Sequence, residues 1–140
     1  MQSKNSITVE TNIKVRLEKL WKFWTNPEDI TQWNNASDDW HTATAENDLK
    51  VGGKFLYRME AKDGSMGFDF DGTYDKIIPN ELIEYTMSDG RKVKVLFSAT
   101  NEGTKVTETF ETENTHPVEM QRAGWQSILD NFRKYTESKQ

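Results

Sequence analysis

The sequence of 140 residues contains no cysteine. Disulfide bonds, thiolate metal sites and cysteine nucleophiles are therefore excluded. Apolar runs are also short, and none approaches the roughly 20 residues of a membrane-spanning helix. The first six residues are polar and lack the apolar core of a signal peptide. We expect a cytoplasmic protein without a membrane span, in which residues 1–140 form a single domain.

Positive charge is scarce, with 18 Lys and Arg against 23 Asp and Glu, which gives a net charge of −5. Nucleic-acid binding normally needs a basic face, and no basic cluster would supply one. An acidic ladder at Asp69, Asp71 and Asp75 lacks the loop spacing of a calcium site and is interpreted as a solvated face of a strand. Glycine-rich phosphate loops, nucleophile elbows and paired-histidine zinc motifs are also absent. We expect no nucleic-acid partner, no cofactor and no metal, and we expect a monomer.

Aromatic side chains carry much of the apolar volume of this sequence. Hydrophobic residues make up only 34% of the chain, yet aromatic residues reach 11%, with five Trp, seven Phe and four Tyr. Large aromatic side chains suit the wall of a cavity as well as a close-packed core.

The hydrophobic periodicity changes three times along the chain. Residues 7–13 alternate as a half-buried strand does, whereas residues 17–24 and 27–33 follow the period of two short helices. From residue 40 onward, six alternating segments are separated by turn signals such as Asp89-Gly90. Residues 117–138 then form one helical stripe, roughly 33 Å long. This order predicts an α+β fold, β-α-α-β6-α, with a seven-stranded antiparallel sheet packed on the C-terminal helix.

Such an arrangement leaves a volume that one helix cannot fill. Sheets twist and coil, and a helix is only about 10 Å wide, so large side chains or an open cavity must occupy the rest of the concave face. Gly72 on the inward face of an aromatic strand and Gly124 on the helix stripe both favour open space. Close backbone packing or a bulge is the alternative for each glycine.

Several segments resemble those of a known superfamily. Residues 24–30 (WTNPEDI) with Trp33, followed by residues 51–55 (VGGKF), resemble the START-like (SRPBCC) superfamily of helix-grip proteins. Residues 72–74 (GTY) and Gly124-Trp125 are similar to the branch named after the activator of heat-shock-protein-90 ATPase. The resemblance covers nearly the whole chain in order, and it implies the helix-grip fold with an internal cavity.

The resemblance implies three kinds of function. The superfamily includes carriers of lipids and sterols, plant hormone receptors, polyketide cyclases and co-chaperone domains. Binding of a small hydrophobic or aromatic, lipid- or polyketide-like molecule is the leading hypothesis. Many bacterial members are small stand-alone domains of undetermined function, and this chain resembles those. A cyclase- or aromatase-like enzyme is the second. A stress-related, co-chaperone-like interaction domain is the third, although the eukaryotic co-chaperone carries an additional N-terminal domain that 140 residues cannot accommodate.

Two side chains are candidates for acid–base chemistry. Glu108 alternates in phase with Val106 and Phe110, which places it on the inward face of its strand. A buried carboxylate must be paired, hydrogen-bonded or protonated, and Arg122 is one candidate partner. His41 follows Trp40 at the start of a strand and could act near neutral pH. A position at the rim or on the surface is the simpler interpretation of both.

The inferred inward positions define a predicted ligand cavity. Its wall comprises aromatic and aliphatic residues of the sheet, two tryptophans beside the loop near residue 35, Glu108, and one face of the last helix. The predicted wall residues are Trp33, Trp40, Phe55, Tyr57, Met59, Phe68, Phe70, Tyr74, Tyr85, Phe97, Glu108, Gly124, Trp125 and Ile128. Trp40 is the residue that we most expect to touch a ligand.

Overall fold

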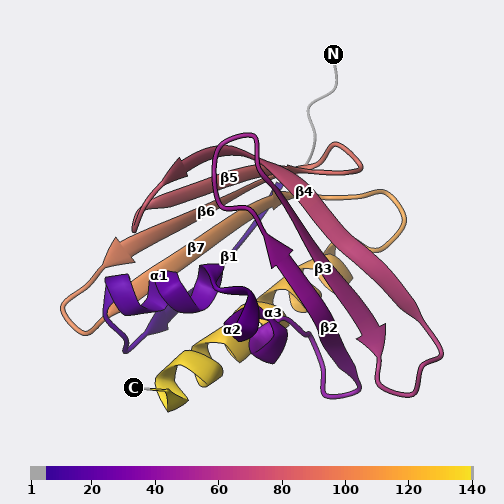
Figure 1. Ribbon diagram of the computed structural model, residues 1–140, viewed down its shortest axis with the longest axis horizontal. Coiled ribbons are helices and arrows are strands. Elements are labelled where there is room, and N and C mark those ends of the chain that lie inside the picture. The colour runs from indigo at the N-terminus through magenta and orange to yellow at the C-terminus, as the bar shows by residue number, and fades with distance from the viewer. Residues whose placement is uncertain (1–5, 140) are drawn as a thin grey trace.

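The computed structural model describes residues 6–139 and contains seven strands and three helices in this part of the chain (Figure 1). In chain order they are β1 (Ser6–Ile13), α1 (Leu17–Thr25), α2 (Pro27–Trp33), β2 (Trp40–Asn47), β3 (Lys54–Ala61), β4 (Gly67–Ile78), β5 (Leu82–Met87), β6 (Lys92–Ala99), β7 (Thr104–Glu111) and α3 (Val118–Ser138). The predicted β-α-α-β6-α order is confirmed.

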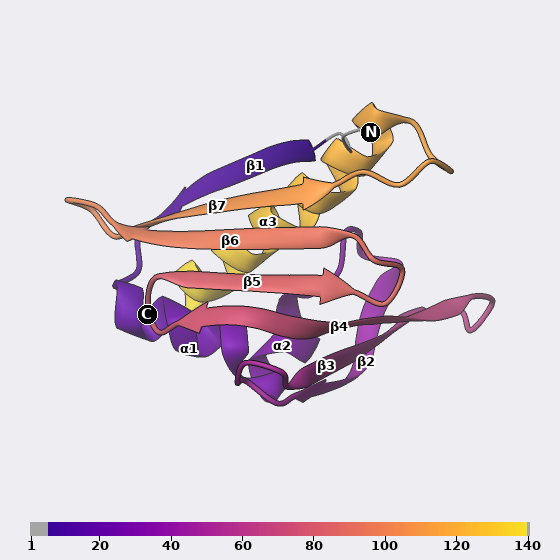
Figure 2. The ribbon, with the colours of Figure 1, turned by 90° about the horizontal axis from the view of Figure 1, so that it is seen from above.

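The strands form one antiparallel sheet in the order β1-β7-β6-β5-β4-β3-β2. Strands β2 to β7 follow one another as a meander, whereas β1 pairs with β7 at the opposite edge from β2. The sheet arches over α3, and α1 and α2 lie between β1 and β2 in the chain and cover one end of the concave side (Figures 1 and 2). This is the predicted α+β helix-grip fold.

Local sequence explains where the elements begin and end. Gly90 has a φ of 92° at the predicted Asp89-Gly90 turn, a left-handed conformation that glycine adopts without strain. Pro27 begins α2, and the side-chain amide of Asn26, the residue before it, donates to the Asp29 carboxylate at 2.9 Å. Pro117 precedes the first turn of α3.

An aromatic cluster closes the end of the molecule where α1 and α2 lie. Phe132 of α3 is fully buried and meets Trp24 and Trp33 edge-on, with ring centroids 4.9 and 4.7 Å apart. Trp21 and Trp24 also pack edge-on against Phe97 of β6, at 5.1 and 5.6 Å. The prediction that Phe97 lines a cavity is therefore wrong, because the two tryptophans of α1 fill the space in front of its ring.

The last helix covers only part of the sheet. Its backbone lies close to β1, α1 and α2, and it approaches the central strands β3 to β6 at few points or none. The view from above shows α3 running obliquely beneath β7, β6 and β5, with β2 and β3 to one side of it (Figure 2). The volume between α3 and these distant strands is where a cavity can persist.

We expect Phe132→Ala to destabilise the protein by about 3–5 kcal/mol, because it removes a fully buried ring that two tryptophans pack against. Denaturant unfolding followed by tryptophan fluorescence measures this change. Leu96→Ala is the control, since Leu96 is 37% exposed on the same sheet, and its cost should stay within about 1 kcal/mol. Equal losses in the two variants would contradict the assigned role of the cluster.

Candidate functional site

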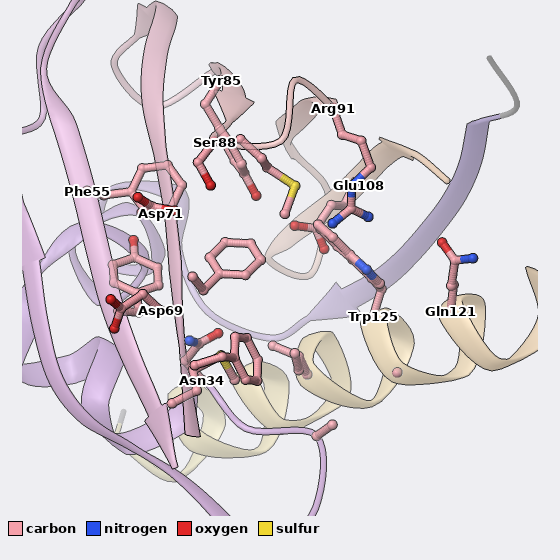
Figure 3. Close-up of a pocket in the computed structure, with 18 of the residues that line it drawn as sticks. Asn34, Phe55, Asp69, Asp71, Tyr85, Ser88, Arg91, Glu108, Gln121 and Trp125 are labelled. Atoms are coloured by element: carbon pink, nitrogen blue, oxygen red, sulfur yellow. The ribbon is translucent and has the colours of Figure 1, made fainter. Parts of the chain in front are cut away.

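A cavity of about 550 Å³ lies between the sheet and α3 (Figure 3). All the predicted wall residues line it except Phe97. Glu108, Arg91 and Trp125 gather on one side of the cavity, and Phe55, Asp69 and Asp71 lie across from them (Figure 3). The cavity therefore has walls contributed by β2 to β5, by β7 and by α3.

Strands β3, β4 and β5 provide a continuous aromatic wall. The ring of Phe55 lies within 4.8 to 5.8 Å of the rings of Tyr57, Phe70, Tyr74 and Tyr85, measured between centroids. Tyr57 and Phe70 pair across β3 and β4 and stack nearly parallel, at 6.1 Å and 10°. Aromatic faces at this density form a rigid apolar surface.

The two glycines that suggested open space behave differently. A Cβ atom at Gly72 would lie 2.9 Å from the Phe55 ring and 2.8 Å from a backbone oxygen, so Gly72 allows close packing of that ring across the strands. A Cβ atom at Gly124 would meet no atom within 4 Å. The space next to Gly124 is therefore empty and belongs to the cavity. Of the two glycines, only Gly124 fits the open-space interpretation.

Trp125 forms the part of the wall that belongs to α3. It stacks on Phe110 of β7 with centroids 4.0 Å apart and an angle of 9°, and its ring meets Phe70 at 6.1 Å on another side. The stacking on a fully buried phenylalanine fixes the indole, because the ring cannot turn without losing that contact. Trp125 thus joins β7 to the aromatic wall of β4.

The tyrosine hydroxyls place polar atoms within the apolar wall. Tyr74 donates a hydrogen bond to Asn47 Oδ1 at 2.5 Å, and burial raises the pKa of Tyr74 to about 12. Burial, followed by the nearby hydroxyls of Tyr74 and Tyr85, raises the pKa of Tyr57 well above its usual value. Burial also raises the pKa of Tyr85, and Glu108 adds to the effect. All three hydroxyls therefore stay neutral near pH 7.

Glu108 is the buried acid of the cavity. Its residue is 6% exposed, and burial raises the pKa of its carboxyl from 4.5 to about 8. Arg122, the partner suggested by the sequence, is instead near Glu119 at 3.6 Å and half-exposed. Among residues 6–139, neither a hydrogen bond nor an ion pair holds the Glu108 carboxyl. The cavity thus contains a carboxyl group that is largely protonated near pH 7.

Arg91 is the charged neighbour that the sequence did not reveal. It follows the β5–β6 turn, lines the cavity, and its Nε donates to Asp89 Oδ2 at 2.8 Å. Its positive charge lies near enough to Tyr85 to oppose part of the rise in that hydroxyl's pKa. A turn signal marks this position only as a loop, so no periodic pattern could have assigned it to the cavity.

The loop between β7 and α3 forms a polar rim. Gln121 on the first turns of α3 accepts a hydrogen bond from the Glu113 backbone N–H at 3.0 Å and donates to the backbone oxygens of Glu113 and His116. The His116 ring lies 3.0 Å from the Glu113 carboxylate. These three residues line the cavity, and sequence analysis missed them because loops have no periodicity.

Apolar side chains are exposed around the mouth. Phe68 at the outer end of β4 and Met120 at the start of α3 both line the cavity and are exposed. The ring centroids of Trp40 and Phe68 are 5.8 Å apart. Asp69 and Asp71, which were expected on the opposite, solvent face, also contribute to the lining, although Asp69 additionally pairs with Arg58 at 3.3 Å.

His41 lies outside the cavity. Its Nε2 atom is 3.7 Å from a carboxylate oxygen of Glu60, and its side chain is 44% exposed. Of the two candidates for acid–base chemistry, the cavity therefore includes Glu108 and not His41.

Within residues 6–139, no group of three or more His, Asp and Glu side chains is arranged to hold a metal ion. In the same part of the chain, no helix has the length and apolarity needed to cross a membrane.

Comparison with known proteins identifies relatives of this chain. Residues 14–137 match the family model of activator of Hsp90 ATPase homolog 1-like proteins. The solution structure of an AHSA1-like protein from Aeromonas hydrophila is 46% identical, covers 96% of this chain and 93% of its own, and has a TM-score of 0.91. A solution structure from Cytophaga hutchinsonii is 48% identical, with coverage of 97% and 93% and a TM-score of 0.80.

More distant structures share the fold alone. The crystal structure of a protein from Chromobacterium violaceum is 20% identical, covers 95% of this chain and 98% of its own, and has a TM-score of 0.86. Among curated proteins, no sequence matches this chain.

The raised pKa of Glu108 predicts a specific dependence of stability on pH. Between pH 4.5 and about 8 the folded protein holds a proton that the unfolded chain releases, so the stabilising contribution is complete below pH 4.5 and is lost as pH rises to about 8. Over this window the wild type should lose stability relative to Glu108→Gln, by roughly 5 kcal/mol at most. Urea unfolding of both proteins at several pH values measures the difference. Parallel stability curves would show that Glu108 is not protonated in the folded state.

Proposed function

The chain belongs to the family of activator of Hsp90 ATPase homolog 1-like proteins, within the START-like superfamily, and we propose that it binds a small hydrophobic or aromatic molecule in the cavity between the sheet and α3. The observation that carries this proposal is a cavity of about 550 Å³ bounded mainly by aromatic rings. Pockets for small molecules usually enclose about 300–1,000 Å³, are mostly apolar, and contain a few polar groups that orient the ligand.

The shape of the wall supports an aromatic or otherwise flat ligand. The stacked pair of Tyr57 and Phe70 and the fixed ring of Trp125, which meets Phe70 edge-on, present adjoining planar surfaces to the cavity. Offset stacking and edge-to-face contacts with such rings contribute about 0.5–1.5 kcal/mol each beyond the burial of apolar area. The exposed apolar side chains of Phe68 and Met120 border the opening through which a ligand would pass.

A second candidate function is acid–base catalysis on the bound molecule, as in a cyclase- or aromatase-like enzyme. The observation that favours it is the pKa of about 8 for Glu108, which lies near the operating pH, as an effective general acid or base requires. In this version, Glu108→Gln abolishes turnover and leaves binding intact. His41 has no part in it because its side chain lies on the outside of the sheet beside Glu60.

Filling the cavity from Gly124 tests the binding proposal without damaging the core. We expect Gly124→Phe to weaken binding of the neutral fluorescent probe N-phenyl-1-naphthylamine about tenfold or more, roughly 1.4 kcal/mol, because the new ring occupies space that is empty in the wild type. Fluorescence titration of the purified protein measures the affinity.

Gly124→Ala is the matched control. Its methyl group also points into open space, so binding should change little, while the better helix propensity of alanine stabilises the protein by about 1 kcal/mol. If the wild type binds no neutral apolar probe, the proposed function is wrong. If Gly124→Phe binds as tightly as the wild type, the binding site lies elsewhere.

A further inference from the structure

Two polar groups in the cavity have no protein partner. The Tyr85 hydroxyl and the Glu108 carboxyl belong to buried residues that line the cavity. Among residues 6–139, no hydrogen bond or ion pair engages either group. In the same part of the chain, every polar side-chain atom that is sealed from solvent has a hydrogen bond, so the free oxygens of Tyr85 and Glu108 face the cavity space. Buried polar groups lose free energy when they remain unpaired, and a ligand can supply the missing partner.

The sheet register places these two groups diagonally across one central strand, offset by two residues. Tyr85 on β5 and Glu108 on β7 lie on opposite sides of β6, whose inward residues between them are Val93 and Val95. Strands two positions apart are separated by about 10 Å, and valine is too short to fill the space above the central strand. The tyrosine and glutamate side chains are longer than the valines and lie near enough for Glu108 to raise the pKa of Tyr85, but no hydrogen bond joins them.

We infer that the ligand carries an uncharged carbonyl oxygen that accepts hydrogen bonds from both the Tyr85 hydroxyl and the Glu108 carboxyl, with its apolar body against the aromatic wall. This inference rests on the proposed binding function and specifies the head group of the ligand. A carbonyl oxygen has two lone pairs and can accept two hydrogen bonds at once. An apolar molecule without such a group leaves both protein groups unpaired.

The surrounding charges disfavour an ionic head group of either sign. Arg91 is the only Lys or Arg among the cavity-lining residues of the described chain, and Asp89 already occupies its Nε. Asp89 therefore already balances part of the Arg91 charge, and a carboxylate ligand would also meet the acidic side chains of Asp71, Asp89 and Glu113. An ammonium head would lie near the Arg91 guanidinium and beside the donor Tyr85. A neutral acceptor avoids both conflicts.

The protonation states agree with this assignment. Burial raises the pKa of Glu108 to about 8 and the pKa of Tyr85 well above its usual value, so both groups carry a proton near pH 7 and can donate it to a hydrogen bond. A carboxylic acid kept neutral in an apolar site is an effective donor to a carbonyl oxygen. The other titratable groups on this side of the cavity are Asp89 and Arg91 after β5, and Glu113 with His116 on the β7–α3 loop.

A series of probes with one apolar body tests the head group. The probes are 2-acetylnaphthalene, its hydrocarbon isostere 2-isopropenylnaphthalene, 2-naphthoate and 2-naphthylmethylammonium, titrated into the full chain at pH 7. The ketone should bind more tightly than either ion. Tyr85→Phe and Glu108→Met should each weaken the ketone about three- to tenfold, the usual effect of one hydrogen bond, and change the isostere less than twofold.

A spectroscopic measurement distinguishes hydrogen bonding from altered packing. The ¹³C resonance of carbonyl-labelled 2-acetylnaphthalene should move downfield on binding to the wild type and less so in Tyr85→Phe. Glu108→Gln keeps an N–H donor, so it should restore most of the ketone affinity lost in Glu108→Met. The wild type should lose ketone affinity as pH rises through about 8, where Glu108 ionises, whereas Glu108→Gln should not.

Control variants remove the same groups elsewhere. Tyr135→Phe deletes a hydroxyl that is bonded to Asp29 outside the cavity, and Glu84→Met deletes an acid of β5 that does not line the cavity. Neither should change the preference for the ketone over its isostere. If Glu108→Met does not fold, the Glu108→Gln pH series and the ¹³C shift remain decisive.

The outcomes separate this inference from the proposed function. If the ketone and its isostere bind alike in all variants, or if only one of the two substitutions matters, the shared carbonyl contact is wrong while binding in the cavity stands. Tighter binding of an ion than of the ketone also overturns the inference. If no probe binds at all, the proposed function fails with it.

Discussion

One helix cannot cover the concave face of a seven-stranded sheet, and the rest of this structure depends on that mismatch. The backbone of α3 stays close to β1, α1 and α2 and leaves β3, β4 and β5 without a helix against them. Tryptophans of α1 and α2 fill the end nearest to them, around Phe97 and Phe132. The remaining volume is left to side chains of the sheet, mostly aromatic rings, and they line it without filling it. The cavity is thus a consequence of topology, and its chemistry is set by which side chains reach it.

Burying Glu108 costs folding free energy, and the packing of the surrounding core offsets that cost. An unpaired carboxyl in an apolar wall disfavours the ionised form, and the group responds by keeping its proton. The buried neighbours on its strand, Val106 and Phe110, belong to the core that stabilises the sheet around it. Such a group is tolerated because the surrounding packing is extensive.

The sequence predicted the fold well because periodicity is a property of local backbone geometry. Alternation assigned the inward face of each strand, and Glu108 lies among the buried residues of β7, as its phase with Val106 and Phe110 implied. Phe97 was misassigned because alternation shows which face of the sheet a side chain is on, but not which other elements cover that part of the face. The tryptophans of α1 pack against Phe97 and separate it from the cavity. Gly72 and Gly124 carried the same sequence signal, yet one allows close packing of a ring and the other borders empty space. Arg91 and the rim formed by Glu113, His116 and Gln121 could not be predicted, since loop conformation determines where those side chains point.

The hydrogen bonds of Gln121 have a consequence for kinetics. Three bonds from one side chain tie the β7–α3 loop to the first turns of α3, so that loop and helix end must move as one body. Exposed side chains such as Phe68 and Met120 rotate within nanoseconds, so under the proposed function a small ligand would not have to wait for the loop to move. A molecule too wide for that opening must await a collective displacement of the loop and helix end, a motion of microseconds to milliseconds. Residence time would then depend on the width of the ligand as well as on its affinity.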